Sequence, residues 1–334
     1  LHYFCLQLDK ASSPYFFINK RKGISMNIAP TIASLSKSKS FAFNKKFVPY
    51  LYVLPSGLFL FAVLGFPILY SVFMSFQKYT LETLVSRHTQ FIGFENYSAV
   101  LRDPAFAVAL KHSLAFTVAC IFFQFTIGLG LAILFSKAFP MSNLMRGLLL
   151  SGWQIPSVVT GTLFLFLFNL DYGLINFVLT SLHIVSEPIG WIVQANRALP
   201  AVIIANIWLG IPFNVILLSA GVAGLPEDVY EAATVDGANG VQKLIYITIP
   251  LLKSTILAVL MLGFIYTLRV FDLIWIITKG GPGSATEVLP TFAYRLSFIN
   301  FNFGRSSAVS VIMLLILLGG AILYLWAITK EERL

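Results

Sequence analysis

Charged residues are scarce in this sequence, and their scarcity excludes an ordinary soluble globular protein. Only 11% of the 334 residues are Asp, Glu, Lys or Arg, whereas 57% are hydrophobic. Soluble globular domains carry about 25% charged residues. The mean hydropathy of +0.83 points the same way. We therefore expect a chain whose main solvent is lipid.

Cysteine and histidine are also scarce, which leaves little material for a disulfide framework or a metal site. The two cysteines, Cys5 and Cys120, lie far apart, and the four histidines are scattered along the chain. Neither pattern has the spacing of a disulfide scaffold or of a set of metal ligands. We predict no metal site.

The short motifs of common enzymes are missing as well. There is no Gly-Lys dipeptide and hence no phosphate-binding P-loop, and neither G-x-S-x-G nor H-E-x-x-H occurs. In the run KGGPG the lysine, Lys279, precedes the glycines, so this run predicts a turn and not a phosphate cradle. The chain is not expected to be an enzyme or to bind a nucleotide itself.

Long apolar runs are what the sequence does contain. Uncharged windows hold 31 residues after Lys46, 25 after Lys111, 24 after Arg146, 29 after Arg197 and 24 after Arg305. A helix of about 20 apolar residues crosses a bilayer, whereas a β-barrel shows alternating segments of about 10. We predict an all-α integral membrane protein with six transmembrane helices, at about 48–76, 108–136, 146–169, 198–222, 254–278 and 306–328.

Two local features modify this plan of six spans. Pro55, Pro67, Pro156 and Pro212 lie inside the spans, where proline is expected to break or kink a helix. The loop 170–197 contains an amphipathic stretch that predicts one short helix at the membrane surface.

The distribution of positive charge predicts the orientation in the membrane. With the N-terminus inside, fourteen Lys and Arg residues fall on cytoplasmic segments and eight on outer segments. Cytoplasmic loops of membrane proteins carry such an excess. The net charge of +9 is therefore a topology signal and not a nucleic-acid surface, and both termini are expected to be cytoplasmic.

The polar segment before the first span divides the chain. Residues 1–46 are rich in Ser and Lys and predict a disordered cytoplasmic leader, followed by a six-helix transmembrane domain at 47–334. Met26 is a candidate translation start, in which case residues 1–25 are not translated.

A few polar and aromatic residues inside the spans are candidates for lining a pathway. Arg269 and Asp272 are the charges within a predicted span, and their i, i+3 spacing allows contact on one helix face. They either line a polar pathway or form a structural ion pair near the outer interface. Phe271, Trp275, Trp208 and the amide of Asn214 are further pathway candidates; ordinary helix packing is the alternative for each.

The stretch EAATVDGANGVQKLIYITIP, Glu231–Pro250, interrupts the apolar pattern between two spans. Its pattern predicts two short helices. Pro226 suits a first helical position, Gly237 can end the first helix, Asn239 can cap the second, and Pro250 restarts the chain as the fifth span. The segment is either a connector at the membrane surface or a contact site for another protein.

This stretch resembles the EAA loop of ABC-importer permeases, and we call residues 225–251 the EAA loop. The positions that match the family's motif are Glu231, Ala232, Ala233, Asp236, Gly237, Ala238, Ile247 and Pro250. Leu244 and Ile249 depart from the residues usual there but remain apolar. The form EAA-x-x-DGA resembles the carbohydrate-importer branch.

Further segments extend the resemblance over nearly the whole chain from about residue 47. They are FIGFENYSAVLRDPAFAVAL at 91–110, YGLINF at 172–177, FDLIWIITKGGPGSATEVLPTFAYRLSF at 271–298 and FGRSSAVSVIM at 303–313. The last two are similar to the first of two paired sugar permeases.

The resemblance implies a type I ABC importer permease fold in a bacterial-type cytoplasmic (inner) membrane. It implies a heterodimer with a second permease, a cytoplasmic ABC ATPase dimer that holds ATP and Mg, and an extracytoplasmic solute-binding protein. In the EAA loop it assigns polar contacts with the ATPase to Glu231, close packing to Ala232 and Ala233, and the turn to Gly237.

Two alternatives stay open. Within the importer class, the substrate is glycerol 3-phosphate or a polyol in place of a sugar. From a different class, an ion-coupled secondary carrier needs no ATPase, but such folds usually show internal repeats and acidic groups at midplane. No clear repeat is found, and Asp272 lies close to an arginine.

Overall fold

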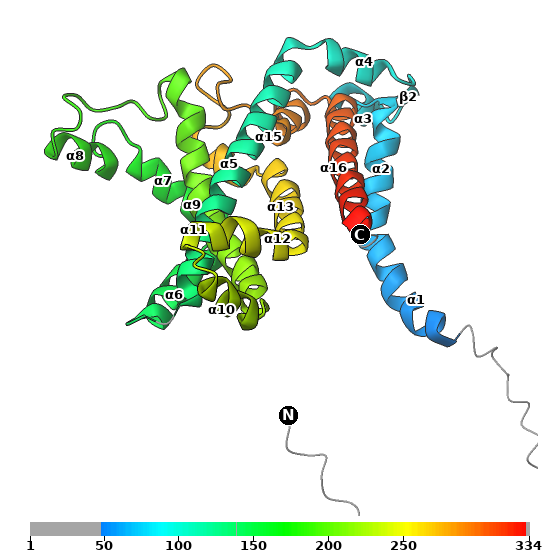
Figure 1. Ribbon diagram of the computed structural model, residues 1–334. Helices are drawn as coiled ribbons and strands as arrows, with labels where there is room; N and C mark the ends of the chain where they lie inside the picture. Colours follow the sequence, from blue (N-terminus) through cyan, green and yellow to red (C-terminus); the bar gives the residue numbers. More distant parts are fainter. Residues whose placement is uncertain (1–47, 138, 332–334) are drawn as a thin grey trace, which may run out of the picture. The chain divides into compact units, whose positions relative to one another are not determined.

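The computed structural model describes residues 48–137 and 139–331 (Figure 1). The predicted leader at 1–46 and the candidate start at Met26 lie outside the described residues. The chain divides into two compact units, Leu1–Phe59 and Leu60–Leu334, and each element below is described within its own unit.

The first membrane-length helical run, Tyr50–Ser75, contains a wide turn ahead of a proline. It consists of α1 (Val48–Leu60), the π-helical segment η1 (Phe61–Gly65) and α2 (Phe66–Ser75). Pro67 has no N–H to donate, and its ring displaces the carbonyl four residues earlier. The wider turn at η1, where the Phe66 N–H donates to the Phe61 carbonyl, accommodates this defect without ending the helix.

A small folded segment joins α2 to α5 and meets the start of the last helix. It contains β1 (Gln77–Lys78), α3 (Leu81–Ser86), β2 (Gln90–Phe91) and α4 (Glu95–Arg102), with β1 and β2 antiparallel. The buried Asn96 amide donates to the carbonyls of Ser75 at 2.9 Å and Gln77 at 2.8 Å. The Gly304 N–H donates to the Tyr79 carbonyl at 3.0 Å, so α16 (Phe303–Glu331) begins beside α2.

The core of the larger unit is the packed pair α5 (Pro104–Ser136) and α9 (Ala195–Ala223). Small buried residues line this contact, among them Ala132 of α5 and Ala201 and Ala205 of α9. Small side chains allow close approach of helices in a membrane, where hydrophobicity alone does not drive association. The Gln124 amide adds a polar tie by donating to the Asn206 carbonyl at 2.8 Å.

Within the described residues, four continuous helical runs are long and apolar enough to span a membrane, and the number rises to six if each of two bent helix pairs is one span. The continuous runs are Tyr50–Ser75, Pro104–Ser136, Ala195–Ala223 and Phe303–Lys330. The third predicted span bends by 101° between α6–η2 (Ser142–Gln154) and α7 (Ser157–Leu167), at Pro156 as expected. By contrast, α9 is one helix through Pro200 and Pro212.

The fifth predicted span, 254–278, is wrong as a single helix. Helix α13 (Lys253–Leu268) ends before Arg269, and a separate helix α14 (Asp272–Ile277) follows after a break of three residues. Helix α14 packs against α7, where Ile276 covers Gly161. This tertiary contact redirects the chain, and hydropathy alone does not reveal a change of direction.

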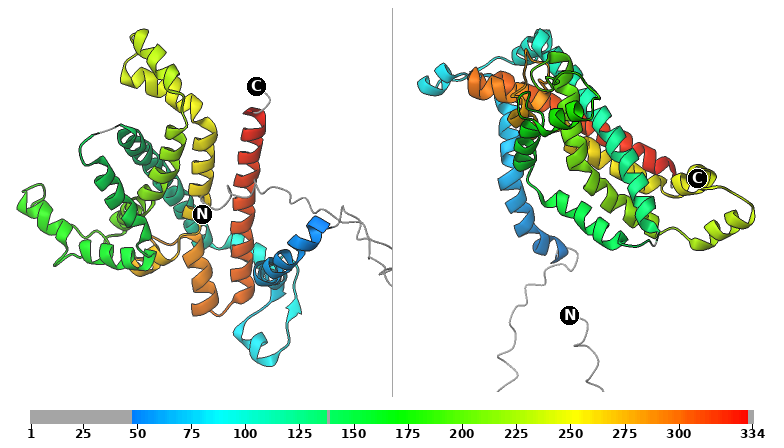
Figure 2. Two further views of the ribbon diagram at one scale, coloured as in Figure 1. Left: turned by 90° about the horizontal axis from the view of Figure 1, so that it is seen from below. Right: turned by 90° about the vertical axis from the view of Figure 1, so that its left-hand side faces the viewer.

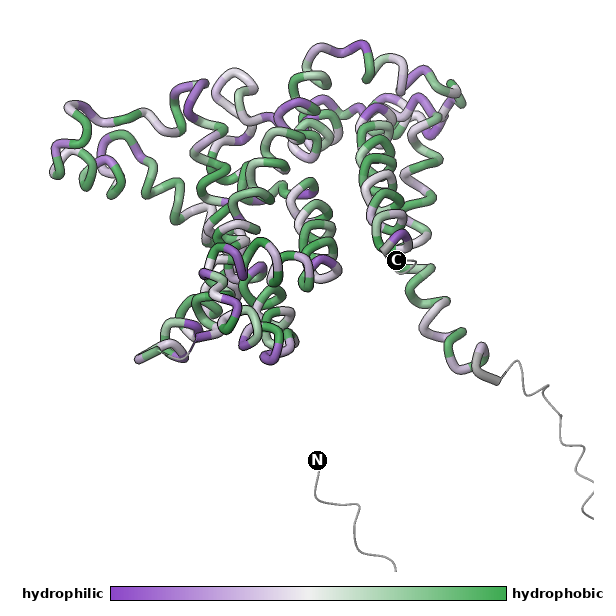
Figure 3. Tube along the Cα trace, in the orientation of Figure 1, coloured by the Kyte–Doolittle hydropathy of each residue, from purple (hydrophilic) through white to green (hydrophobic). Residues whose placement is uncertain are grey.

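Helix α8 (Leu174–Ser181) is the short helix predicted in the loop 170–197. It is held by the buried Asn176, which accepts from the Trp191 indole and the Ile189 N–H, each at 3.0 Å. The chain after α14 continues through α15 (Leu289–Tyr294) and η4 (Arg295–Ile299) into α16. Hydrophobic residues run along the long helices, while hydrophilic ones gather at their ends (Figure 3).

Candidate functional site

The EAA loop projects from one end of the α5–α9–α13 group as two short helical pieces (Figure 2). Its first piece is α10 (Glu227–Val235), with Glu227 and Asp228 in the first turn, where carboxylates favour the positive end of the helix dipole. Pro226 is the N-cap and not the first helical residue, a correction of one position. Gly237 has a φ of 80° in the left-handed region, as predicted for the residue that turns the chain.

The second piece starts with the predicted cap and ends differently from the prediction. The Asn239 side chain accepts from the Gln242 N–H at 2.9 Å, and the Gln242 side chain accepts from the Asn239 N–H at 2.8 Å. The helix then continues through α11 (Gly240–Lys243), the π-helical η3 (Leu244–Thr248) and α12 (Ile249–Leu251). The 75° bend before α13 falls at Leu252, so Pro250 does not restart the chain.

Two hydrogen bonds between side chains connect the two pieces. The hydroxyls of Tyr230 and Thr248 lie 2.8 Å apart, and the Lys243 ammonium donates to the Thr234 hydroxyl at 2.6 Å. None of these four residues is among the predicted site residues. The i, i+4 spacing of Tyr230 and Thr234 places them on one helix face, but nothing local in the sequence indicates their partners on the second piece.

The exposed face of the EAA loop is acidic. Glu227, Asp228, Glu231 and Asp236 are all exposed, as is Ala232. Ala233 is only 9% exposed, and its carbonyl accepts from the Ala238 N–H at 2.9 Å. Ala232 is therefore available for close packing by another protein, whereas Ala233 packs within the loop; the packing role of the two alanines stays a prediction.

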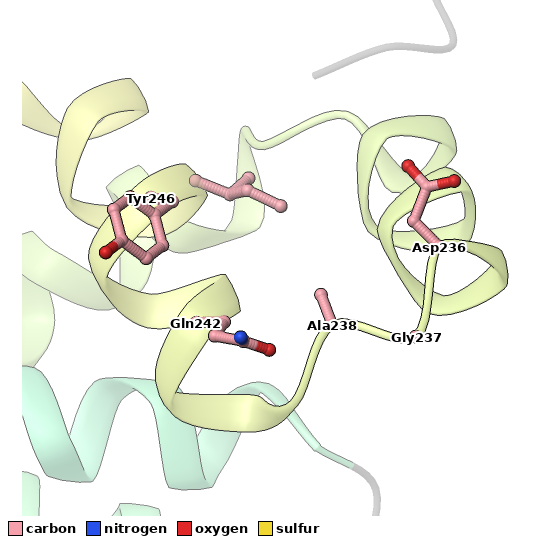
Figure 4. Close-up of a pocket in the computed structure, with 6 residues that line it drawn as sticks. Asp236, Gly237, Ala238, Gln242 and Tyr246 are labelled. Atoms are coloured by element: carbon pink, nitrogen blue, oxygen red, sulfur yellow. The ribbon is translucent and has the colours of Figure 1, made fainter.

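A shallow groove of about 310 Å³ lies between the two pieces. It is lined by Asp236, Gly237, Ala238, Gln242, Tyr246 and Ile247. In Figure 4, Asp236 lies at the end of α10 and Gln242 and Tyr246 on the following helix, with Gly237 and Ala238 between them. Tyr246 is 75% exposed, so the groove has an exposed aromatic residue on one side and Asp236 on the other.

Arg269 and Asp272 do not form the pair that their spacing allowed. The helix break separates them; the Arg269 guanidinium lies 5.8 Å from the centroid of the Tyr266 ring, and Asp272 accepts from the Ser157 hydroxyl at 3.4 Å. The i, i+3 geometry holds only within one continuous helix. Both side chains are exposed on the surface of the unit.

The predicted pathway aromatics fall into separate groups. Phe271 and Trp275 stack with centroids 5.6 Å apart, and both contact Tyr294, at 5.0 and 4.6 Å, which in turn contacts Phe298. A groove of about 310 Å³ runs beside this aromatic group, and its hydroxyl-bearing lining residues include Ser297, Ser306 and Ser310.

Other aromatic and amide candidates lie elsewhere. Trp208 packs edge-on against Phe164 of α7 at 5.9 Å. Asn214 is 4% exposed, and its amide donates to the Gly210 carbonyl of its own helix at 2.9 Å. Asn214 therefore lies in the contact between helices. Within the described part of the chain it does not lie beside the Phe271–Trp275 group.

Comparison with known families identifies one match that covers most of the chain. The family described as binding-protein-dependent transport system inner membrane component matches residues 124–330. This range contains the EAA loop and every pathway candidate above.

Three curated relatives share about a third of their residues with this chain. The trehalose/maltose transport system permease protein MalF of Thermococcus litoralis is 32% identical over 70% of this chain and 79% of the relative. The sulfoquinovosyl glycerol transport system permease protein SmoG of Agrobacterium fabrum is 32% identical over 83% and 89%. The diacetylchitobiose uptake system permease protein DasB of Streptomyces coelicolor is 30% identical over 85% and 88%.

A solved structure has the same fold. The chain superposes with a TM-score of 0.71 on a bacterial ABC transporter involved in the import of the acidic polysaccharide alginate, covering 84% of this chain and 96% of that one. The sequence identity is 21%, so this likeness concerns the fold alone.

Proposed function

The chain belongs to the family of binding-protein-dependent transport system inner membrane components, and we propose that it is one of two paired permease subunits of an ATP-driven ABC importer for a sugar. It holds no phosphate-binding loop of its own, so ATP and Mg belong to a partner ATPase dimer. The second permease completes the pathway, and an extracytoplasmic binding protein delivers the substrate.

The observation that supports this proposal most directly is the form of the EAA loop. A turn at Gly237 and two cross-bridging hydrogen bonds hold a projecting, acidic surface with Glu231, Ala232 and Asp236 exposed. Such a surface is complementary to a basic cleft, and preformed complementary surfaces associate at lower entropic cost. Glu231 makes polar contacts with the ATPase, Ala232 packs closely against it, and Asp236 adds charge beside the groove.

The orientation follows from the charge distribution. The EAA loop and both termini lie on the cytoplasmic side, where Lys and Arg are in excess, and α4, α8 and α15 lie on the outer side. The bacterial-type cytoplasmic membrane is the location that fits the family.

A neutral sugar is the substrate class that the pathway candidates favour. The Phe271–Trp275–Tyr294 group offers aromatic faces beside serine hydroxyls, and none of the described residues that line that groove is charged. Arg269 is the cation among the candidates, and it lies over the Tyr266 ring. Glycerol 3-phosphate favours additional cations, and a polyol stays the alternative within the class.

A crosslink tests the coupling assignment. In a background with Cys5→Ser and Cys120→Ala, Glu231→Cys is paired with single cysteines around the cleft of the ATPase that co-assembles with the chain, with and without ATP. We expect a crosslink whose yield depends on nucleotide. Glu187→Cys, an exposed acidic position in the outer loop, is the matched control and is expected to give none.

The opposite outcome is equally clear. If Glu231→Cys forms no crosslink at any cleft position while the chain alone accumulates substrate in vesicles under an ion gradient, the importer assignment fails. The ion-coupled carrier then takes its place.

A further inference from the structure

The turn between α14 and α15, Thr278–Glu287, has a strained backbone on the surface of the larger unit. Four of its residues have positive φ: Lys279 at 52°, Gly280 at 85°, Gly283 at 54° and Ser284 at 66°. Glycine tolerates this region, but lysine and serine adopt it only at an energetic cost. Residues held this way persist only where the surroundings fix them.

Hydrogen bonds within the turn fix part of its shape. The Thr286 hydroxyl donates to the Gly281 carbonyl at 2.8 Å and lies 2.7 Å from the Thr278 hydroxyl, while the Thr286 N–H donates to the Gly280 carbonyl at 3.2 Å. These bonds close the turn at its base and leave its tip, which includes the exposed Lys279 and Gly283, to the solvent.

An ion pair with a buried carboxylate lies directly beneath the turn. Glu287 is 2% exposed and pairs with Arg295 of η4, which is 37% exposed and also donates to the Lys279 carbonyl at 3.4 Å. A Cβ on Gly280 would lie 2.8 Å from Glu287 Oε2 and 3.1 Å from Arg295 Nη2. The turn therefore rests on the pair with no space between them.

The same pair adjoins the spanning helix α5. The Leu289 N–H, at the start of α15, donates to the Ser113 hydroxyl of α5 at 2.7 Å. Beside Ser113, His112 has a buried Nδ1 without a hydrogen bond, and the Oε1 atom of Glu287 also has none. Burial raises the pKa of the Glu287 carboxyl, which Arg295 and His112 oppose.

Stability alone does not account for such an arrangement. The pair is a poor source of stability, because burying the Glu287 carboxylate costs desolvation energy and water screens the partly exposed Arg295. Here one carboxylate oxygen is also left without a partner, which adds to the cost of burial. What the pair does provide is a defined position for the turn above it.

We propose that Glu287 and Arg295 are positioning residues for transport, which hold the tip Lys279–Ser284 as a preformed contact surface for the extracytoplasmic binding protein. The proposal rests on the importer function proposed above, which puts this turn on the outer side. In Figure 1 the turn lies at the end of the α5–α9 group opposite to α10 and α11. Preorganisation lowers the entropic cost of a transient association, so a fixed turn suits a partner that binds and leaves in each cycle.

The composition of the tip favours a protein partner in water over lipid. The run KGGPGS contains no large apolar side chain, and Lys279 is charged and exposed. Peptide groups of an open turn need hydrogen-bonding partners, which the hydrocarbon of a bilayer does not supply. The second permease is the other possible occupant and is distinguished by experiment.

The test uses the complete transporter in lipid nanodiscs, with the binding protein that stimulates ATP hydrolysis by the wild-type complex. The measurement is the rate of ATP hydrolysis against the concentration of sugar-loaded binding protein. For Glu287→Gln we expect the half-maximal concentration to rise about tenfold with little change in the maximal rate. Arg295→Lys keeps the positive charge, so we expect it to raise the half-maximal concentration less than Glu287→Gln does. Glu187→Gln, at an exposed position, is the control and should leave the half-maximal concentration unchanged.

The outcomes separate this inference from the proposed function. If the wild-type complex is stimulated and Glu287→Gln titrates like wild type, the positioning role is overturned. A fall in maximal rate without a shift in half-maximal concentration also contradicts it, because a general structural defect acts that way. If no binding protein stimulates the wild-type complex, the importer proposal itself fails, and this inference with it.

A second measurement covers the case in which Glu287→Gln does not assemble. A photocrosslinker on Lys279→Cys, with the ion pair intact and in the background without native cysteines, is expected to form an adduct with the binding protein during turnover. Adducts only with the second permease or with lipid would assign the tip to that occupant and overturn the proposal.

Discussion

Gly237 determines the shape of the EAA loop through its backbone and not through lack of space. Its φ is 80°, while a Cβ built there meets nothing within 4 Å. The requirement is therefore conformational. Gly240, three residues later, has equal space and a φ outside the left-handed region, which makes it a matched control.

Gly237→Ala is expected to separate ATP hydrolysis from uptake. The left-handed conformation costs a non-glycine residue roughly 1–2 kcal/mol, so the turn reshapes and α10 changes direction. The measurement is sugar uptake per ATP hydrolysed in proteoliposomes, which should fall for Gly237→Ala and stay near wild type for Gly240→Ala. Equal ratios in both variants would show that the turn has no role in coupling.

Tyr294 is the residue that unites the outer aromatic group. It contacts Phe271, Trp275 and Phe298 at centroid distances of 4.6–5.0 Å. If this group lines the sugar route, Tyr294→Ala should raise the KM for uptake several-fold, since each aromatic pair contributes about 0.5–1.5 kcal/mol. Tyr294→Phe keeps the aromatic ring and should leave the KM close to the wild-type value. Tyr52→Ala, at an 81% exposed position, is the control. An unchanged KM for Tyr294→Ala would remove the group from the route.

At the scale of secondary-structure elements, the EAA loop is two helical pieces held together by a few side chains. Tyr230 and Thr248 are separated by 18 residues and joined at 2.8 Å. Thr248 also donates to the Lys243 carbonyl at 3.1 Å, so its hydroxyl keeps a partner when Tyr230 loses its own.

Tyr230→Phe is expected to loosen the loop without unfolding it. A single hydrogen bond contributes about 1 kcal/mol, and the Thr234–Lys243 bond stays in place. Hydrogen exchange should be faster at the amides of η3 and α12 in this variant. Tyr246→Phe, which changes an exposed tyrosine of the same loop, should leave the exchange unchanged; similar exchange in both variants would contradict the bridging role.

Short-range sequence patterns predicted which segments form helices better than they predicted the directions in which successive helices run. Uncharged windows located the spans, and the chemistry of Gly237 and Asn239 located the turn and the cap, because these signals act within a few residues. The break after Leu268 and the bend at Leu252 were missed, because packing between distant helices sets them. The Glu287–Arg295 pair was missed for the same reason, since only the folded turn brings the two together.

At the scale of the whole molecule, the larger unit has its two proposed contact surfaces at opposite ends of its core helices. The acidic EAA loop follows α9 at one end, and the turn above Glu287 lies beside α5 at the other (Figure 1). Because α5 and α9 pack along each other, the EAA loop and the turn above Glu287 are attached to the same pair of helices. The proposed orientation assigns one end to the cytoplasm and the other to the outside.

Accessibility labelling tests that orientation. In the background without native cysteines, Lys279→Cys should react with a membrane-impermeant maleimide added to intact spheroplasts, whereas Glu231→Cys should react only after the membrane is opened. Both positions are exposed in the structure, so burial does not explain a difference. The reverse pattern would invert the topology and with it the assignment of both contact surfaces.

The bridged form of the EAA loop has a mechanical consequence. A flexible connection bends and absorbs part of a displacement, whereas a stiff connection transmits the displacement to the helix that follows it. The bonds Tyr230–Thr248 and Thr234–Lys243 reduce the compliance of the loop, and its second piece passes at Leu252 directly into α13. On the proposed function, a displacement imposed on α10 would reach α13 with little loss, and the stiffness of these few residues would set how much motion each ATP cycle transmits.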